Sequence, residues 1–404
     1  MSASEYDVVV VGARVAGAST AMLLARAGAK VALVDRNAHG SDTLSTHGLM
    51  RAGVLQLSRW GMLDAVVAAG TPPIRRTLFH YTGGETVQVT IRPGPGVDAL
   101  YAPRRHVLDR ILVDAAAAAG ADVHHELTVT GLLRDPDAAE RVVGVRARHR
   151  DGRSLDIRGR ITVGADGIRS LVANQAGADV VRAGRTASAV LYRYFADLPT
   201  AGYEWAFGDH SAAGLIPTNH RLTCVFVSTM PRSMRQLRRH GTEAAFSALL
   251  DTAAPGFVPR VRAAQRAGRS HGWAGVPGFF RRSQGPGWAL VGDAGYYKDP
   301  ITTHGMTDAM RDAELLSMAL LEALSGGVPE RLALAGYQAT RDALSHRLFD
   351  ATEEVAAYDW DTTRIQALLR QVSSAMSDEV DHLTALPSRA LGADSADGLM
   401  PSPA

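Results

Sequence analysis

The residues best suited to chemistry stand near the start of the chain, in the segment Gly-Ala-Arg-Val-Ala-Gly at positions 12–17. Valines fill positions 8–11, as in a strand buried on both faces of a parallel sheet. Residues 17–29 are rich in Ala, Leu and Met at helical spacing, and residues 31–34 form a second apolar strand. A helix that starts at such a turn presents free N–H groups to a pyrophosphate. The segment therefore predicts a dinucleotide site within a strand–helix–strand unit.

Individual residues of this unit have separate roles in the prediction. Gly12 permits the tight turn, and Gly17 permits close approach of helix and sheet. Asp35, at the end of the second strand, can accept hydrogen bonds from an adenosine ribose. Arg14 stands at the position of the middle glycine of the fingerprint, where a side chain obstructs the closest backbone approach. A guanidinium there could instead pair with phosphate, so both interpretations of Arg14 stay open.

Composition narrows the class of protein. The formal net charge of 404 residues is only +2, which gives no reason to expect a nucleic acid or an anionic membrane as partner. Cys224 is the sole cysteine, so the chain has no internal disulfide and no cysteine-rich metal site. The first seven residues lack the features of a signal peptide, and no apolar run approaches the length of a membrane span. We expect a cytoplasmic protein without a membrane span or a bound metal.

The pattern of apolar and aromatic residues changes along the chain. Alternating, aromatic-bearing strands after about residue 184 indicate an antiparallel sheet with one ligand-facing side. We therefore expect an α/β fold: a Rossmann-like nucleotide-binding domain with an inserted antiparallel-sheet substrate domain and C-terminal helices. The expected boundaries are 1–75, 97–180 and 280–325 for the nucleotide domain, 76–96 and 181–279 for the sheet domain, 326–387 for the C-terminal helices, and 388–404 for a disordered tail.

Two further motifs extend the pattern. They are Gly-Ala-Asp-Gly-Ile-Arg-Ser at 164–170 and the segment 292–314, which begins Gly-Asp-Ala-Gly-Tyr-Tyr-Lys-Asp-Pro. Together with positions 12–17, and in this order, they resemble the flavin-dependent monooxygenase superfamily typified by p-hydroxybenzoate hydroxylase, to which geranylgeranyl reductases are related. The resemblance spans roughly residues 5–350.

The resemblance implies that the nucleotide is FAD. Asp293 would contact the ribityl chain, Pro300 and Gly305 the isoalloxazine, and Asp166 would lie near the pyrophosphate and the NAD(P)H site. Arg105 matches an arginine near the flavin phosphates, with Arg104 as its alternative. The full set of implied cofactor contacts is Gly12, Arg14, Ala16, Gly17, Asp35, Arg36, Thr46, Arg105, Val129, Asp166, Gly292, Asp293, Pro300, Gly305 and Met306.

The resemblance also implies a reaction. In a monooxygenase (hydroxylase), NADPH or NADH reduces FAD, or a separate flavin reductase does so, O₂ adds at flavin C4a, and the hydroperoxide oxidises a hydrophobic or aromatic small molecule. The run Asp-Pro-Ile-Thr at 299–302 is more similar to geranylgeranyl reductases and leaves an alkene reductase as an alternative. A non-catalytic binding protein of the same fold is the third. Residues 214–217 lack the tryptophans of halogenases, which argues against halogenation.

Single residues complete the prediction. His47 and His304 are candidates for a catalytic role near the flavin, although either could simply serve a helix end or a buried hydrogen bond. The candidates for the wall of the substrate pocket are Tyr192, Tyr194, Trp205 and Tyr297. The first three lie on alternating strands, where one face of the sheet would meet flavin and substrate. Buried tyrosines with satisfied hydroxyls are common, so a purely structural role is the alternative.

Overall fold

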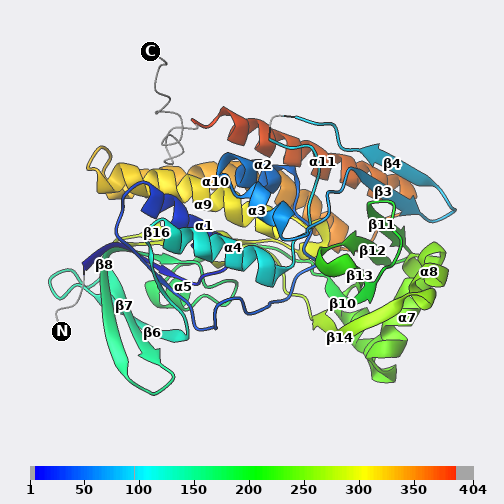
Figure 1. Cartoon of the computed structure of the whole chain (residues 1–404), viewed down its shortest axis with the longest axis horizontal. Helices are drawn as coiled ribbons and strands as arrows, with labels where there is room; N and C mark the ends of the chain where they lie inside the picture. Colours follow the sequence, from blue (N-terminus) through cyan, green and yellow to red (C-terminus); the bar gives the residue numbers. More distant parts are fainter. Residues whose placement is uncertain (1–4, 95, 388–404) are drawn as a thin grey trace, which may run out of the picture.

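The computed structural model describes residues 5–94 and 96–387. The predicted tail at 388–404 lies outside the described residues. Two sheets occupy the two ends of an elongated molecule, and three long helices run along one side (Figure 1). The mixed α/β fold with a Rossmann-like unit and a separate sheet confirms the predicted fold class.

The first sheet has a parallel centre. In the described part of the chain it contains eight strands, of which β17, β8, β1, β2 and β5 are parallel neighbours in that order. β16 extends one edge, and β6 and β7 form an antiparallel extension on β8. Their bounds are β1 Glu5–Val11, β2 Val31–Val34, β5 Asp122–His124, β6 Leu127–Arg134, β7 Val142–His149, β8 Ser154–Gly164, β16 Gln284–Gly285 and β17 Trp288–Leu290.

Helices cover one face of this sheet. β1 buries Val8 and Val10 on the side of α1 and α9, and Val9 and Val11 on the side of β7 and a short helix, α5. Burial on both faces explains the unbroken valine run. The helices of this part are α1 Val15–Arg26, α2 Arg51–Arg59, α3 Leu63–Ala68, α4 Arg105–Ala118, α5 Leu171–Ala176 and α9 Gly305–Leu324.

The second sheet has seven strands within the described residues, in the order β14-β10-β13-β12-β11-β3-β4. All neighbours are antiparallel except β11 and β3. One face packs under helices α6–α8, and the other carries the aromatic side chains. The bounds are β3 Arg76–Tyr81, β4 Thr86–Thr90, β10 Ala189–Ala196, β11 Tyr203–Gly208, β12 Ser211–Pro217, β13 Leu222–Thr229, β14 Gln265–Trp273, α6 Pro231–Leu237, α7 Thr242–Ala253 and α8 Val258–Ala263.

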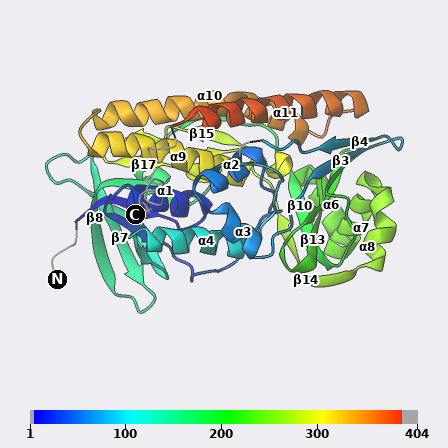
Figure 2. The same ribbon diagram turned by 45° about the horizontal axis from the view of Figure 1, so that its top comes forward.

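The C-terminal helices α10 (Glu330–Ala356) and α11 (Thr362–Ala385) lie side by side above α9 and reach from the first sheet to the second (Figure 2). A small third sheet of β9 (Val180–Ala183), β15 (Phe279–Arg281) and β18 (Tyr296–Tyr297) joins the two halves of the chain. Within 5–94 and 96–387, no helix combines the length and apolarity needed to cross a membrane.

Candidate functional site

The turn between β1 and α1 has no room for side chains at two of its glycines. Gly12 has φ +104°, and a Cβ there would lie 2.4 Å from the carbonyl oxygen of Ala165. A Cβ on Gly17 would lie 1.8 Å from the carbonyl oxygen of Gly12. The first turn of α1 therefore packs directly on the backbone that follows β1 and β8.

Asp35 lies beside this turn. Its buried carboxylate accepts hydrogen bonds from the backbone N–H groups of Ala13 and Asn37, each at 2.7 Å. The carboxylate lines a small cavity, which leaves room for about one water molecule. The lining residues are Ala13, Arg14, Asp35, Ala38, Gly40, Ser41, Asp109, Val113 and His125. The structure thus places Asp35 and the glycine turn together, as a ribose–pyrophosphate site requires.

The side chain of Arg14 leaves the turn and contacts two other elements. Its guanidinium donates to the backbone oxygen of Ser41 at 2.5 Å, to Ser41 Oγ at 2.9 Å and to Asp109 of α4 at 2.9 Å. Asp109 also pairs with Arg105 at 3.2 Å. Arg104 instead bonds Asp42 at 2.8 Å. Of the two consecutive arginines, Arg105 is therefore the one that lies beside the glycine turn.

The third motif meets α1 at Gly292. This residue has φ +58°, and a Cβ there would lie 2.9 Å from the Cβ of Ala16. The next side chain, Asp293, is exposed, although its neighbours on both sides are buried. It makes no hydrogen bond or ion pair with any described residue. Although the residue is exposed, the protein near its carboxyl group displaces water, and this desolvation raises its pKa to about 6, against the opposing influence of Arg105 and Lys298. An exposed carboxylate with free acceptor atoms suits the hydroxyls of a ribityl chain.

The N-terminus of α9 follows. Gly305 is exposed, and a Cβ there would meet no atom within 4 Å, so the first residue of this helix of 20 residues borders open space. Pro300 begins a single 3₁₀ turn just before it, and Met306 packs into the core. The positive end of the helix dipole favours negative charge at this place, which suits a reduced flavin.

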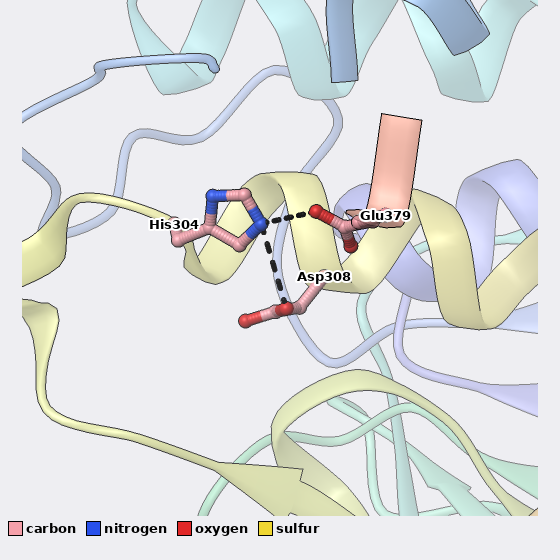
Figure 3. Close-up of side chains that lie close together, drawn as sticks. All are labelled: His304, Asp308 and Glu379. Carbon is pink, nitrogen blue, oxygen red and sulfur yellow. Dashed lines mark hydrogen bonds and ion pairs between the residues drawn. The ribbon is translucent and has the colours of Figure 1, made fainter. Parts of the chain in front are cut away.

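His304, which immediately precedes α9, points into a buried charged cluster (Figure 3). Its Nε2–H donates to Glu379 of α11 at 2.6 Å, and Asp308 lies 3.8 Å from the same nitrogen. The ligand atoms of these residues lie within 4.8 Å of one another, as in a metal site. However, Lys298 is ion-paired with Asp308, and Arg311 bonds both carboxylates at 3.0–3.1 Å. Since two cations already neutralise the carboxylates, we assign no metal to this cluster.

Burial governs the protonation of the cluster. Desolvation, reinforced by Arg311, lowers the pKa of Lys298 to about 7. Desolvation also opposes ionisation of Glu379, but His304 and Arg311 outweigh it and hold the pKa of Glu379 at about 2. His304 itself has a lowered pKa, chiefly through burial. The imidazole of His304 is bonded to Glu379 of α11. Its predicted contact with a flavin stays a prediction.

The predicted pocket wall lies on the inner face of the second sheet. Tyr192, Tyr194 and Trp205 share this face with Cys224 and Phe226. The Tyr192 hydroxyl accepts the backbone N–H of Ser45 at 3.2 Å, and burial raises its pKa to about 12. Tyr297, on β18, is also buried, and burial raises its pKa further. Tyr192, Tyr194 and Trp205 thus form one aromatic wall next to the loop that follows β2, whereas Tyr297 belongs to the third sheet.

His47 joins that loop to the wall. Its Nε2 is hydrogen-bonded to the Tyr194 hydroxyl, and its backbone has φ +69°, an uncommon conformation for a residue other than glycine. Nδ1 is buried without a hydrogen-bond partner in the described part of the protein. Burial, with Arg104 nearby, holds the pKa of His47 well below its usual value, so the imidazole is neutral. Strain and an unsatisfied polar atom at one residue are typical of functional sites.

Other predicted cofactor residues have different surroundings. Asp166 accepts the Ser170 hydroxyl at 2.5 Å and the Leu171 N–H at 2.7 Å, and so caps α5. Val129 packs on the core between β6 and β7, whereas Arg36 is exposed and Thr46 is half-buried. Contacts of these residues with a cofactor stay predictions.

Several residues of the site were not predicted. Ser41, Asp109 and Glu379 make polar contacts described above but belong to no motif, and Lys298 lies within the 292–314 motif but was given no role. Asp109 stands four residues after Arg105, and this spacing on a helix could have predicted the Arg105–Asp109 ion pair.

The strand–turn–helix cradle, the acid after β2 and the open N-terminus of α9 define a dinucleotide-binding flavoprotein fold. Residues 5–352 match the family model described as "FAD binding domain", and the chain belongs to this family. The residues present fit FAD, because the turns at Gly12 and Gly292 have no room for a Cβ, and Gly292 is followed by the exposed carboxylate of Asp293, which has no hydrogen-bond partner among the described residues.

Relatives of this chain include both oxygenating and reducing enzymes. Squalene epoxidase ERG1 of Candida albicans is 27% identical over 369 residues, which cover 79% of this chain and 72% of the epoxidase. The digeranylgeranylglycerophospholipid reductase of Methanothrix thermoacetophila is 30% identical over 340 residues, which cover 80% of this chain and 79% of the reductase. The chain is thus a member of a family of FAD-dependent oxidoreductases.

Solved structures agree on the fold. The myxobacterial chondrochloren halogenase CndH matches with a TM-score of 0.78 and 21% identity, covering 96% of this chain and 99% of that one. P. aeruginosa PqsL matches with a TM-score of 0.75 and 22% identity, covering 93% of this chain and 100% of that one. At these identities the likeness concerns the fold alone.

Proposed function

We propose that this protein is an FAD-dependent monooxygenase that uses NAD(P)H and O₂ to oxidise a hydrophobic or aromatic small molecule. The observation that carries the proposal is the aromatic wall of the second sheet, which His47 links to the loop after the nucleotide-binding unit. Such a wall can hold an apolar substrate and exclude water beside a flavin. FAD supplies the redox chemistry when bound, taking hydride and activating O₂.

The chain's own residues bind, orient and control protons. Asp293 and the N-terminus of α9 would hold the ribityl chain and the ring of FAD, and the turn at Gly12 its pyrophosphate. The phenol groups of Tyr192 and Tyr194 stay protonated near neutral pH, since burial raises the pKa of both. Neutral His47 can hold or accept a proton at Nε2, where the Tyr194 hydroxyl is bonded.

A second candidate is an alkene reductase of the geranylgeranyl reductase kind. The named reductase relative, at 30% identity, favours it together with the Asp-Pro-Ile-Thr run at 299–302. The epoxidase relative, whose reaction inserts oxygen, favours the monooxygenase. Reduction by a separate flavin reductase, in place of direct use of NAD(P)H, is compatible with either reaction.

Product analysis separates the two reactions. The FAD-loaded protein is reduced with NADH, NADPH or a flavin reductase and given aromatic and isoprenoid substrates, either under isotopically labelled O₂ or without O₂. A monooxygenase transfers one labelled oxygen atom to the product and is inactive without O₂. A product that instead gains two hydrogens, and forms equally well without O₂, establishes the alkene reductase.

A further inference from the structure

Two arginines from different elements hold the loop formed by residues 41–47. Arg14, the N-cap residue of α1, donates to both the backbone oxygen and the hydroxyl of Ser41. Arg104, the N-cap residue of α4, donates to Asp42 at 2.8 Å. All three acceptor atoms belong to the adjacent residues Ser41 and Asp42, so the start of the loop is fixed from two sides.

The anchor of Arg14 is itself buried and charged. Its guanidinium is bonded to Asp109, whose side chain is 4% exposed and is shared with Arg105. An arginine held by a buried carboxylate and a backbone oxygen keeps a defined direction, because its planar fork uses several donors at once. Arg14 therefore holds Ser41 and Asp109 together in this fold. The sequence suggested only two roles for Arg14, a phosphate ligand or an obstruction, and neither describes this one.

The contacts continue from the loop into the second sheet. The Arg104 guanidinium lies 4.1 Å from the centre of the Tyr194 ring, and the Tyr194 hydroxyl is bonded to His47 at the other end of the loop. Tyr194 in turn is paired across the sheet with Cys224. A continuous set of contacts thus leads from Arg14, through the 41–47 loop and Arg104, to the aromatic wall.

We propose that Arg14 is a positioning residue that fixes the 41–47 loop and, through Arg104 and His47, keeps the aromatic wall closed around Tyr194. The nucleotide cradle and the aromatic wall are then coupled through one loop. The proposal does not rest on the reaction assigned above, since it concerns the order of the chain itself. Its test requires neither substrate nor turnover.

Cys224 supplies the reporter. It is the sole cysteine of the chain, it is fully buried, and burial raises its thiol pKa, so its modification by a disulfide reagent such as DTNB reports opening of the wall. Arg14→Gly restores the fingerprint residue and removes the guanidinium. We expect Cys224 in this variant to react about tenfold faster than in the natural chain, because a charge-assisted anchor is lost. Hydrogen exchange at 41–47 should rise with it.

Matched variants separate the coupling from general loss of stability. Asp42→Asn weakens the second anchor and should also speed modification of Cys224, whereas Arg110→Ala, at an exposed arginine of α4, should not. Urea unfolding gives the change in global stability of each variant. The proposal is overturned if Arg14→Gly leaves the Cys224 rate unchanged, even with faster exchange in the loop. It is equally overturned if the faster rate is no larger than the measured loss of global stability explains.

Discussion

Glu379, near the end of α11, accepts a 2.6 Å hydrogen bond from His304, the residue that immediately precedes helix α9. Both side chains are almost completely buried. The contact joins residues 75 positions apart in sequence, and it ties the C-terminal helix α11 to the start of α9 (Figure 3). The C-terminal helices therefore do more than cover the sheet: they fix the start of α9.

Loss of Glu379 should destabilise the protein strongly. Glu379→Ala removes the buried acceptor of His304 and one of the buried acceptors of Arg311, and we expect the free energy of unfolding to fall by about 3 kcal/mol. Glu379→Gln keeps the shape and one acceptor, so its loss should be smaller. Asp381→Asn, at an exposed position of the same helix, is the control and should change stability little. Urea unfolding at neutral pH measures all three.

Comparison of the natural protein with Glu379→Gln at different pH values gives a second test. The pKa of Glu379 is about 2 in the folded protein and 4.5 in an ordinary glutamate. A carboxyl whose folded pKa is lowered contributes stability that is complete above its unfolded pKa and is lost as the pH falls towards the folded value. The stability difference between the natural protein and Glu379→Gln should therefore shrink between about pH 5 and about pH 3. A difference that stays constant over this interval contradicts the assigned ion pair.

Adding one methyl group at two helical glycines should have opposite effects. In Gly17→Ala the new Cβ meets the Gly12 carbonyl oxygen, so we expect a loss of about 2 kcal/mol or more and loss of FAD binding. In Gly336→Ala, within α10, the new Cβ meets nothing within 4 Å, and helix propensity predicts a gain of up to about 1 kcal/mol. Thermal melting and FAD fluorescence measure both variants. Equal behaviour of the two would refute the assigned close packing at the cradle.

Asp293 should matter for the cofactor and not for the fold. Its carboxylate makes no hydrogen bond or ion pair with the residues at 5–94 and 96–387, and desolvation raises its pKa, so Asp293→Ala should not lower the melting temperature of the FAD-free protein and should raise it somewhat at neutral pH. If Asp293 bonds the ribityl hydroxyls as proposed, its loss should weaken FAD binding about tenfold or more. A fluorescence titration with FAD checks this, and an unchanged affinity would remove Asp293 from the site.

The two tyrosines of the wall should differ. The Tyr194 hydroxyl is bonded to buried His47, whereas the Tyr192 hydroxyl accepts a long 3.2 Å bond from a half-buried backbone N–H. Tyr194→Phe leaves a second nitrogen of His47 without a partner and should cost about 1–3 kcal/mol. Tyr192→Phe should cost less than about 1 kcal/mol. Chemical denaturation of both variants tests the order, and the reverse order would contradict the described His47 geometry.

The parts of the fold that depend on local pattern could be predicted. The valine run of β1, the glycine turn and the helical spacing of α1 identified the nucleotide-binding unit, and alternation placed Tyr192, Tyr194 and Trp205 on one face. Strand alternation and helical spacing can be recognised within a few consecutive residues, so these elements could be predicted from local sequence alone.

Long-range pairings could not be predicted in the same way. The bonds of Arg14 with Asp109 and of His304 with Glu379 join residues 95 and 75 positions apart, and they depend on how helices cross. The third sheet, of β9, β15 and β18, was missed for the same reason, because strands of two to four residues show no period of their own. Consequently the candidate set contained His304 but not the cluster that holds it.

The most direct test of the central claim is the reaction of the reduced, FAD-loaded protein with O₂, followed by stopped-flow absorbance with and without aromatic substrates. The monooxygenase account predicts a short-lived species whose spectrum differs from those of reduced and oxidised flavin, and whose decay a true substrate accelerates while it gains one oxygen atom. Direct return to oxidised flavin with release of peroxide under all conditions, together with reduction of an alkene substrate without O₂, would contradict it.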